Sequence, residues 1–126
     1  MSLRTPLGRV RGLGSAKEGV KHWWAQRVTA VALVPLTIWF VISLLILARA
    51  EYESAVEWIA YPCNTVLLVV LLSSVFYHAM LGLQVVIEDY VHDEGAKIAF
   101  LLTMKFVVVL LAASSILAVL RIAFGG

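Results

Sequence analysis

The fold is decided by residues 61–87, which read YPCNTVLLVVLLSSVFYHAMLGLQVVI. This run of 27 residues contains no Asp, Glu, Lys or Arg, and a helix needs roughly 20 apolar residues to cross a bilayer. On its N-terminal side, residues 28–48 form another run without charge. On its C-terminal side, residues 98–120 form a further run in which Lys105 is the only charge. Because backbone polar groups in lipid must bond within their own segment, we expect each run to be a transmembrane helix.

Composition leads to the same fold class. The chain has 126 residues, of which 62% are hydrophobic, and its mean hydropathy is +0.95. A soluble domain of this length could not bury so much apolar surface. We therefore predict an all-α membrane protein with three transmembrane helices at about 28–48, 61–87 and 98–123. Residues 1–27 would be an N-terminal segment, and residues 28–126 a three-helix anchor domain.

The distribution of basic residues predicts the orientation in the membrane. Cytoplasmic segments carry an excess of Lys and Arg, so we expect the N-terminus and the loop from Glu88 to Lys97 inside, and the loop from Arg49 to Ala60 and the C-terminus outside. Topology accounts for the positive charge, so we expect contact with membrane lipid and no nucleic-acid partner. The N-terminal cations are Arg4, Arg9, Arg11, Lys17, Lys21 and Arg27, against the single acid Glu18.

His78 is the first candidate site residue. Apart from Cys63 and two tyrosines, it is the only side chain in residues 61–87 that can titrate, and it lies roughly 13 Å along a helix from Ile87. A polar group at that depth is costly and marks a functional site if a partner for it can be named. The lone Cys63 excludes an internal disulfide and is interpreted as a packing residue.

Several roles for His78 are open. On spacing alone, a neutral imidazole that bonds a neighbouring helix is the leading interpretation. A proton relay is poorly supported, because Lys105 is the only other charge at depth. A zinc or copper site needs more ligands than the spans supply. Haem needs one axial histidine per side, so a second chain could supply the other. His22 and His92 lie at the interface, and Met104 is an internal candidate that we do not favour.

Two further features follow His78 in the second span. Gly82 follows one turn later, where it would leave room for a porphyrin or simply for a closely packed helix. Asp89 and Tyr90 come where the apolar run ends. They could be an interfacial aromatic residue beside a solvated acid, or a phenol that donates to a quinone carbonyl with a carboxylate nearby.

These residues resemble a known family. His78, ten intervening residues and then Asp89-Tyr90, at the cytoplasmic end of the second of three spans, resemble the hydrophobic membrane-anchor D subunits of succinate dehydrogenase (complex II), of the bacterial type with haem b. His22, four residues and then Arg27-Val28-Thr29-Ala30 resemble the family's His…Arg-x-Thr-Ala entry into the first helix. The resemblance covers the chain from about His22 onward.

The resemblance implies a role for each of these residues. His78 would be an axial ligand of the haem b iron, with the opposite ligand on a companion C subunit. His22 and Arg27 would lie near the haem propionates. Tyr90 would bond a carbonyl of ubiquinone, and Asp89 would support that site through a basic residue of the companion.

It also implies function, partners and location. The chain would be a membrane-anchor, non-flavin subunit of succinate:ubiquinone oxidoreductase, an enzyme of the tricarboxylic acid cycle and aerobic electron transport; whether the isolated chain is itself an enzyme stays open. Its partners would be a flavoprotein, an iron–sulfur subunit and a cytochrome b-type C anchor subunit. The bacterial inner membrane is expected in preference to the mitochondrial one.

Two other classes of function remain open. The chain could be a haem-free structural or assembly subunit of another respiratory or transport complex, in which His78 is purely structural. It could also be a small proton-coupled transporter, which predicts substrate flux by the chain alone. Lys105 has no role in the family pattern, and we expect its side chain to reach toward the inner interface.

Overall fold

A computed structural model of the chain describes residues 16–125. Within this range the chain is helical and contains no strand, and three of its helices are long and apolar enough to cross a membrane. The prediction of an all-α protein with three membrane-spanning helices is therefore confirmed, and the chain is a multi-pass membrane protein. The helices are α2 (Ala16–Leu47), α3 (Tyr52–Ala60), α4 (Pro62–Tyr90) and α5 (Glu94–Ala123).

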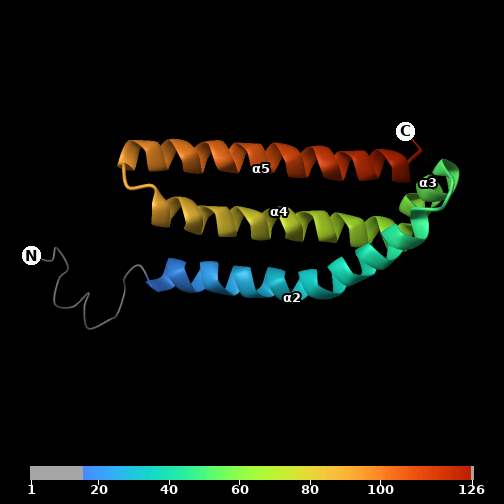
Figure 1. Cartoon of the computed structure of the whole chain (residues 1–126), viewed down its shortest axis with the longest axis horizontal. Helices are drawn as coiled ribbons and strands as arrows, with labels where there is room; N and C mark the ends of the chain where they lie inside the picture. The colour runs from blue at the N-terminus through green and yellow to red at the C-terminus, as the bar shows by residue number, and fades with distance from the viewer. Residues whose placement is uncertain (1–15, 126) are drawn as a thin grey trace, which may run out of the picture.

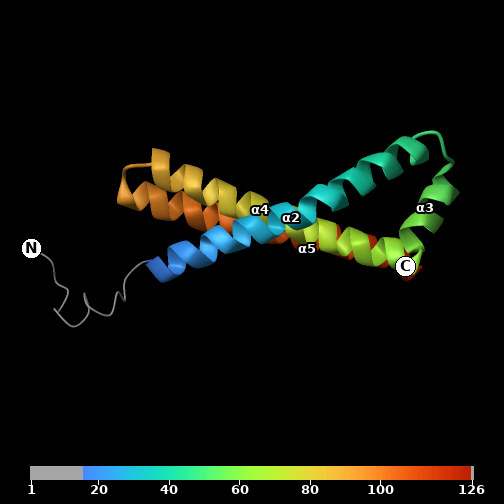
Figure 2. The same ribbon diagram turned by 90° about the horizontal axis from the view of Figure 1, so that it is seen from below.

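Helix α4 is the centre of the structure. Figure 1 shows α5 and α2 on opposite sides of α4, with the start of α2 and the α4–α5 connection at one end and α3 and the C-terminus at the other. In the second view α2 crosses the α4–α5 pair obliquely (Figure 2). The buried apolar residues of the described range all belong to α4, and they are Leu68, Leu71 and Leu81. So small a core leaves most apolar side chains facing outward, toward lipid or other chains.

Helix α2 bends in its second half, as expected from the proline inside it. Pro35 cannot donate the backbone bond of a regular helix, and Figure 1 shows the helix curving toward α3. A little farther along, Ser43 Oγ donates to the carbonyl of Trp39 at 2.8 Å. The divergence of α2 opens an apolar cavity of about 920 Å³ among the four helices. The chain therefore does not close its own core at this end.

A short helix occupies the connection that we expected to be a loop. Helix α3 packs its aromatic residue Trp58 on Trp39 of α2, with ring centroids 5.4 Å apart and planes 23° from parallel. The start of α4 holds it from the other side, because Asn64 Nδ2 donates to the carbonyl of Trp58 at 2.9 Å. Three acidic residues, Glu51, Glu53 and Glu57, are exposed at or next to this helix. Nine residues are too few for a periodic pattern to distinguish a helix from a loop.

The helix ends lie outside the predicted apolar runs. Helix α2 includes residues 16–27 of the N-terminal segment, and α4 continues past Ile87 to Tyr90. An apolar run marks the part of a helix that lies in hydrocarbon, and the backbone stays helical into the interface. Pro62 stands in the first turn of α4, where the N–H group that proline lacks would have no partner within the helix. Arg4, Arg9 and Arg11 lie outside the described residues.

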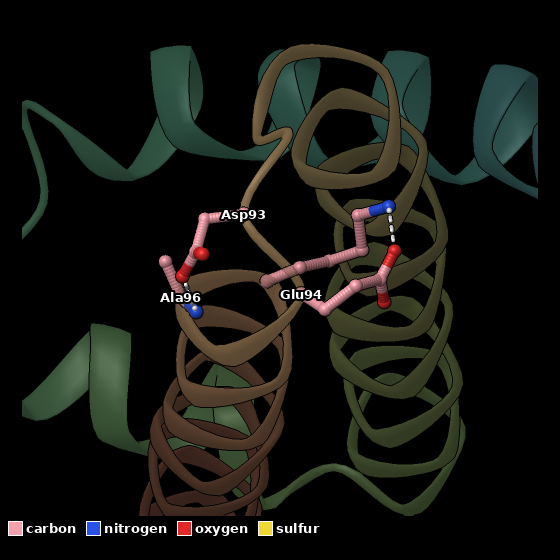
Figure 3. A network of polar contacts seen from close by, with 4 residues as sticks. Asp93, Glu94 and Ala96 are labelled. Atoms are coloured by element: carbon pink, nitrogen blue, oxygen red, sulfur yellow. Dashed lines mark hydrogen bonds and ion pairs between the residues drawn. The ribbon is translucent and has the colours of Figure 1, made fainter.

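The turn between α4 and α5 is closed by a helix cap. Asp93 accepts a hydrogen bond from the backbone N–H of Ala96 at 2.9 Å, and Glu94 forms an ion pair with Lys97 at 3.5 Å (Figure 3). A carboxylate at this position satisfies one of the free N–H groups at a helix start and suits the helix dipole. The cap fixes where α5 begins relative to the end of α4.

Candidate functional site

The side chain of His78 links α4 to α2. Its Nδ1 lies 2.9 Å from Oγ1 of Thr29, across the contact between the two helices. The ring is half-buried. The imidazole thus has a partner inside the chain, as expected for a polar group at this depth. The fold supplies one bond to one nitrogen of the ring.

The other ring nitrogen, Nε2, has no partner in the described part of the chain. The only buried side-chain atom there without a hydrogen bond is Oε1 of Gln26, so Nε2 of His78 is accessible at the surface of the helices. Two polar groups of one small region therefore have unmet bonding capacity. A buried amide oxygen without a donor is rare in protein structures, so Gln26 is a second polar group here whose hydrogen bonding the described chain does not complete.

Gln26 of α2 lies beside Gly82, the residue of α4 that comes one turn after His78. A Cβ atom added to Gly82 would have Nε2 of Gln26 as its nearest neighbour, at 4.0 Å. That distance is an ordinary van der Waals contact, so no atom of the described chain requires a glycine here. The two interpretations of Gly82, room for a porphyrin and close packing of another helix, are therefore not distinguished by contacts within this chain.

His22 and Arg27 occupy different sides of α2. His22 comes seven residues, about two turns, before Thr29, so the two residues share one side of the helix. Arg27 is roughly 160° away from Thr29 around the helix axis. The Arg27 guanidinium lies over the ring of Trp23, 5.2 Å from its centroid. The structure therefore does not bring Arg27 together with His78 within this chain. Arg27 is exposed, on a side of α2 where another subunit or ligand could meet it.

Asp89 and Tyr90 form a second location, in the last turn of α4. Both side chains are exposed, and Tyr90 keeps 78% of its surface accessible. Neither has a hydrogen bond or ion pair to another described residue. Tyr90 is twelve residues beyond His78, or roughly 18 Å along the helix axis. The chain therefore exposes both groups at the end of α4, without a partner among the described residues.

Two polar residues near His78 received no role from the sequence. The Arg27-Val28-Thr29-Ala30 motif contains Thr29 without assigning it a role, and Gln26 belongs to no motif. Both lie on the side of α2 that faces α4. Their spacing of three residues places them on one helix face, and that was the available signal. No group of three or more His, Cys, Asp or Glu residues that could hold a metal lies between residues 16 and 125.

Comparison with known proteins identifies a family. The chain matches the model of the succinate dehydrogenase/fumarate reductase transmembrane subunit over residues 1–112. It is 32% identical to the succinate dehydrogenase hydrophobic membrane anchor subunit of Rickettsia bellii (strain RML369-C), over 116 residues that cover 92% of this chain and 93% of the relative.

Other relatives carry related names. The succinate dehydrogenase hydrophobic membrane anchor subunit of Paracoccus denitrificans is 36% identical over 107 residues, which cover 81% of this chain and 79% of that protein. The succinate dehydrogenase membrane anchor subunit of Reclinomonas americana is 25% identical over 96 residues, which cover 74% of this chain and 80% of that protein. No solved structure shows a significant match to the chain.

Proposed function

The chain belongs to the succinate dehydrogenase/fumarate reductase transmembrane subunit family, and from this premise we propose that it is the D-type anchor of a succinate:ubiquinone oxidoreductase. It is a membrane anchor subunit of an oxidoreductase complex. In the proposal it shares one haem b with a companion C anchor and contributes to the ubiquinone-reduction site. It holds a flavoprotein and an iron–sulfur subunit at the membrane.

The accessible nitrogen of His78 carries this proposal. Nδ1 bonds Thr29 inside the chain, whereas Nε2 has no partner among the described residues and is open at the surface. An axial ligand needs this arrangement, with one nitrogen oriented by the protein and the other free for iron. With one such histidine in the chain, His78 would hold the haem iron together with a ligand from a second chain. When bound, haem b supplies one-electron transfer.

His22 and Arg27 are the residues of this chain proposed to hold the haem propionates. Both precede Thr29 on α2, toward the end where α4 meets α5 (Figure 1). Arg27 offers a planar guanidinium that can bind a carboxylate with two bonds. Its cation–π contact with Trp23 is exposed, so the guanidinium can leave the ring without breaking a buried bond.

Tyr90 and Asp89 are proposed to serve the quinone. The Tyr90 hydroxyl donates to a carbonyl of ubiquinone and stabilises the negative charge that builds on that oxygen as electrons arrive. Asp89 holds a basic residue of the companion subunit beside the pocket. Both are exposed at the membrane edge, where water can deliver the two protons of quinone reduction without a relay through the membrane.

Orientation and location follow from the same premise. We assign the N-terminus and the α4–α5 turn to the cytoplasmic side, where succinate is oxidised, and α3 with the C-terminus to the outer side. The matched relatives from Rickettsia and Paracoccus are bacterial proteins, which supports the bacterial inner membrane as the location.

A haem-free structural role is the second candidate, and the bond to Thr29 favours it. A neutral imidazole bonded to a hydroxyl across two helices would be sufficient as packing. The two functions differ in the fate of Nε2, which the structural role leaves without a partner in a low-dielectric environment.

Purification of the whole complex through a tag on this chain separates them. We expect a flavoprotein, an iron–sulfur protein and a second anchor to co-purify, with b-type bands in the dithionite-reduced minus oxidised spectrum and succinate:ubiquinone reductase activity. An active complex without b-type bands would leave only the structural role for His78.

A further inference from the structure

We propose that Thr29 is a positioning residue for His78: its hydroxyl accepts the Nδ1–H bond and so holds the imidazole in the tautomer whose Nε2 lone pair is free to bind iron. This inference rests on the proposed function. It assigns a task to a residue of the Arg-Val-Thr-Ala motif that the family resemblance left without one. The observations that carry it are three distances around one oxygen atom.

The Thr29 hydroxyl has one proton and several acceptors within reach. Its Oγ1 lies 2.7 Å from the carbonyl oxygen of Ala25 and 3.1 Å from that of Gln26. The 2.7 Å distance is the shorter, and a threonine in a helix commonly donates to the carbonyl four residues before it. The proton is therefore committed to α2 itself. The remaining lone pairs of Oγ1 can only accept.

This commitment determines the protonation of the facing ring. His78 Nδ1 lies 2.9 Å from the same oxygen. A neutral imidazole carries its proton on one nitrogen and a lone pair on the other. Because Oγ1 acts as acceptor, the proton belongs on Nδ1, and Nε2 keeps its lone pair.

The opposite tautomer is poorly matched to the structure. It would place the ring proton on Nε2, which has no acceptor in the described part of the chain. It would also require the Thr29 proton to leave the Ala25 carbonyl for Nδ1. The observed geometry avoids both changes. Thr29 thus favours the ligand form of the ring before any iron is present.

The bond also fixes where the ring points. Thr29 is on α2 and His78 on α4, so the imidazole plane is set by the packing of two helices rather than by one side chain. Metal-binding histidines usually donate their second N–H to such a partner, which orients the ring and raises its basicity as a ligand. Loss of the acceptor should weaken the donation of electrons from His78 to iron and shift the haem potential upward.

The test uses the purified whole complex and four variants. Thr29→Val keeps the shape and removes the hydroxyl, Thr29→Ser keeps the hydroxyl, and Thr29→Ala removes both the hydroxyl and the methyl. Thr37→Val is the matched control, because Thr37 is an exposed threonine of the same helix. The measurements are haem per complex, the midpoint potential of haem b and the electron paramagnetic resonance signal of its ferric form.

We expect Thr29→Val to raise the midpoint potential and alter the ferric signal, with haem retention lowered by roughly 10-fold or more under dilution, as for loss of other partners of ligating histidines. Thr29→Ser and Thr37→Val should match the wild type. If Thr29→Val retains no haem, the serine and alanine variants decide: haem kept by serine and lost by alanine supports the hydroxyl. Serine and valine behaving alike, or valine behaving as wild type, overturns the proposal.

These outcomes are distinct from failure of the proposed function. A wild-type complex without haem b, or one that keeps normal haem after His78→Ala, would remove His78 as a ligand whatever Thr29 does. A complex that loses haem on His78→Ala but is indifferent to every Thr29 variant would refute only the positioning role.

Discussion

Asp89 lies on the same side of α4 as His78, about three helical turns beyond it. Asp89 comes eleven positions after His78, which is close to three turns of 3.6 residues each. Tyr90 follows roughly a third of a turn around the axis. One companion surface running along α4 can therefore meet both the imidazole at depth and the carboxylate at the edge. This alignment explains how two sites roughly 18 Å apart could be completed by the same partner.

Replacement of His78 by Ala should abolish the b-type absorption of the purified complex. The chain would lose its only proposed axial ligand, and no other histidine lies at that depth in the described residues. The measurement is the reduced minus oxidised spectrum, normalised to the flavin content. His92→Ala is the matched control, because His92 is exposed in the turn between α4 and α5. An unchanged spectrum in His78→Ala would remove this residue from the ligand set.

Tyr90→Phe should slow ubiquinone reduction by roughly ten- to hundredfold, because a hydrogen bond to developing charge is worth about 1.5–3 kcal/mol. Succinate oxidation with an artificial acceptor should be nearly unchanged, since electrons then leave before the quinone. Tyr52→Phe is the control, as Tyr52 is an exposed tyrosine at the opposite end of the structure. Equal loss of both activities in Tyr90→Phe would contradict a quinone role.

The sequence predicted the parts of the fold that depend on membrane depth. Three apolar runs predicted three spanning helices, and the structure confirms them. The two prolines, Pro35 and Pro62, stand where the chain has a bend and a helix start. Helix α3 was missed because its position depends on packing, with Trp58 on Trp39, and not on hydropathy. An apolar run measures the thickness of hydrocarbon, so it also underestimates each helix by its interfacial turns.

The sequence predicted how deep His78 lies in the membrane, but not which residue of the neighbouring helix it faces. The polar character of His78 and its place in the second span could be read from the sequence, whereas its bond to Thr29 depends on how α2 turns against α4. The separation of Arg27 from the side of α2 that carries His22 and Thr29, by contrast, follows from helical periodicity alone and could be predicted from the sequence. The roles of Tyr90 and Asp89 stay predictions, because both side chains are exposed and no described residue contacts them through a hydrogen bond or ion pair.

Asp93→Ala should lower the stability of the α4–α5 turn by about 0.5–2 kcal/mol, the usual loss for a helix cap. Asp93 accepts from the Ala96 N–H, and the variant leaves that group to water (Figure 3). Thermal unfolding of the complex in detergent measures the change. Glu94→Gln is the control, because it breaks only the exposed ion pair with Lys97 and should cost less than about 1 kcal/mol. A larger loss in Glu94→Gln would show that the cap is not the dominant interaction.

The native thiol of Cys63 can test the orientation directly. Cys63 is the single cysteine of the chain, and it is exposed in the first turn of α4. The proposed topology places it on the outer side, so a membrane-impermeant maleimide should label it in spheroplasts. The comparison is Cys63→Ser combined with Gly95→Cys, which moves the thiol to the opposite end of the helices.

A new side chain at Gly95 has space for this test. A Cβ there would meet Oδ2 of Asp93 at 3.4 Å, the lower limit of ordinary contact. The relocated thiol should react in inside-out vesicles and stay unlabelled in spheroplasts, with both variants labelled fully after denaturation. Labelling of Cys63 only in inside-out vesicles would show that the chain has the opposite orientation. Tyr90 and Asp89 would then lie on the outer side, away from the subunits that oxidise succinate, and their proposed role at the quinone would fail with the orientation.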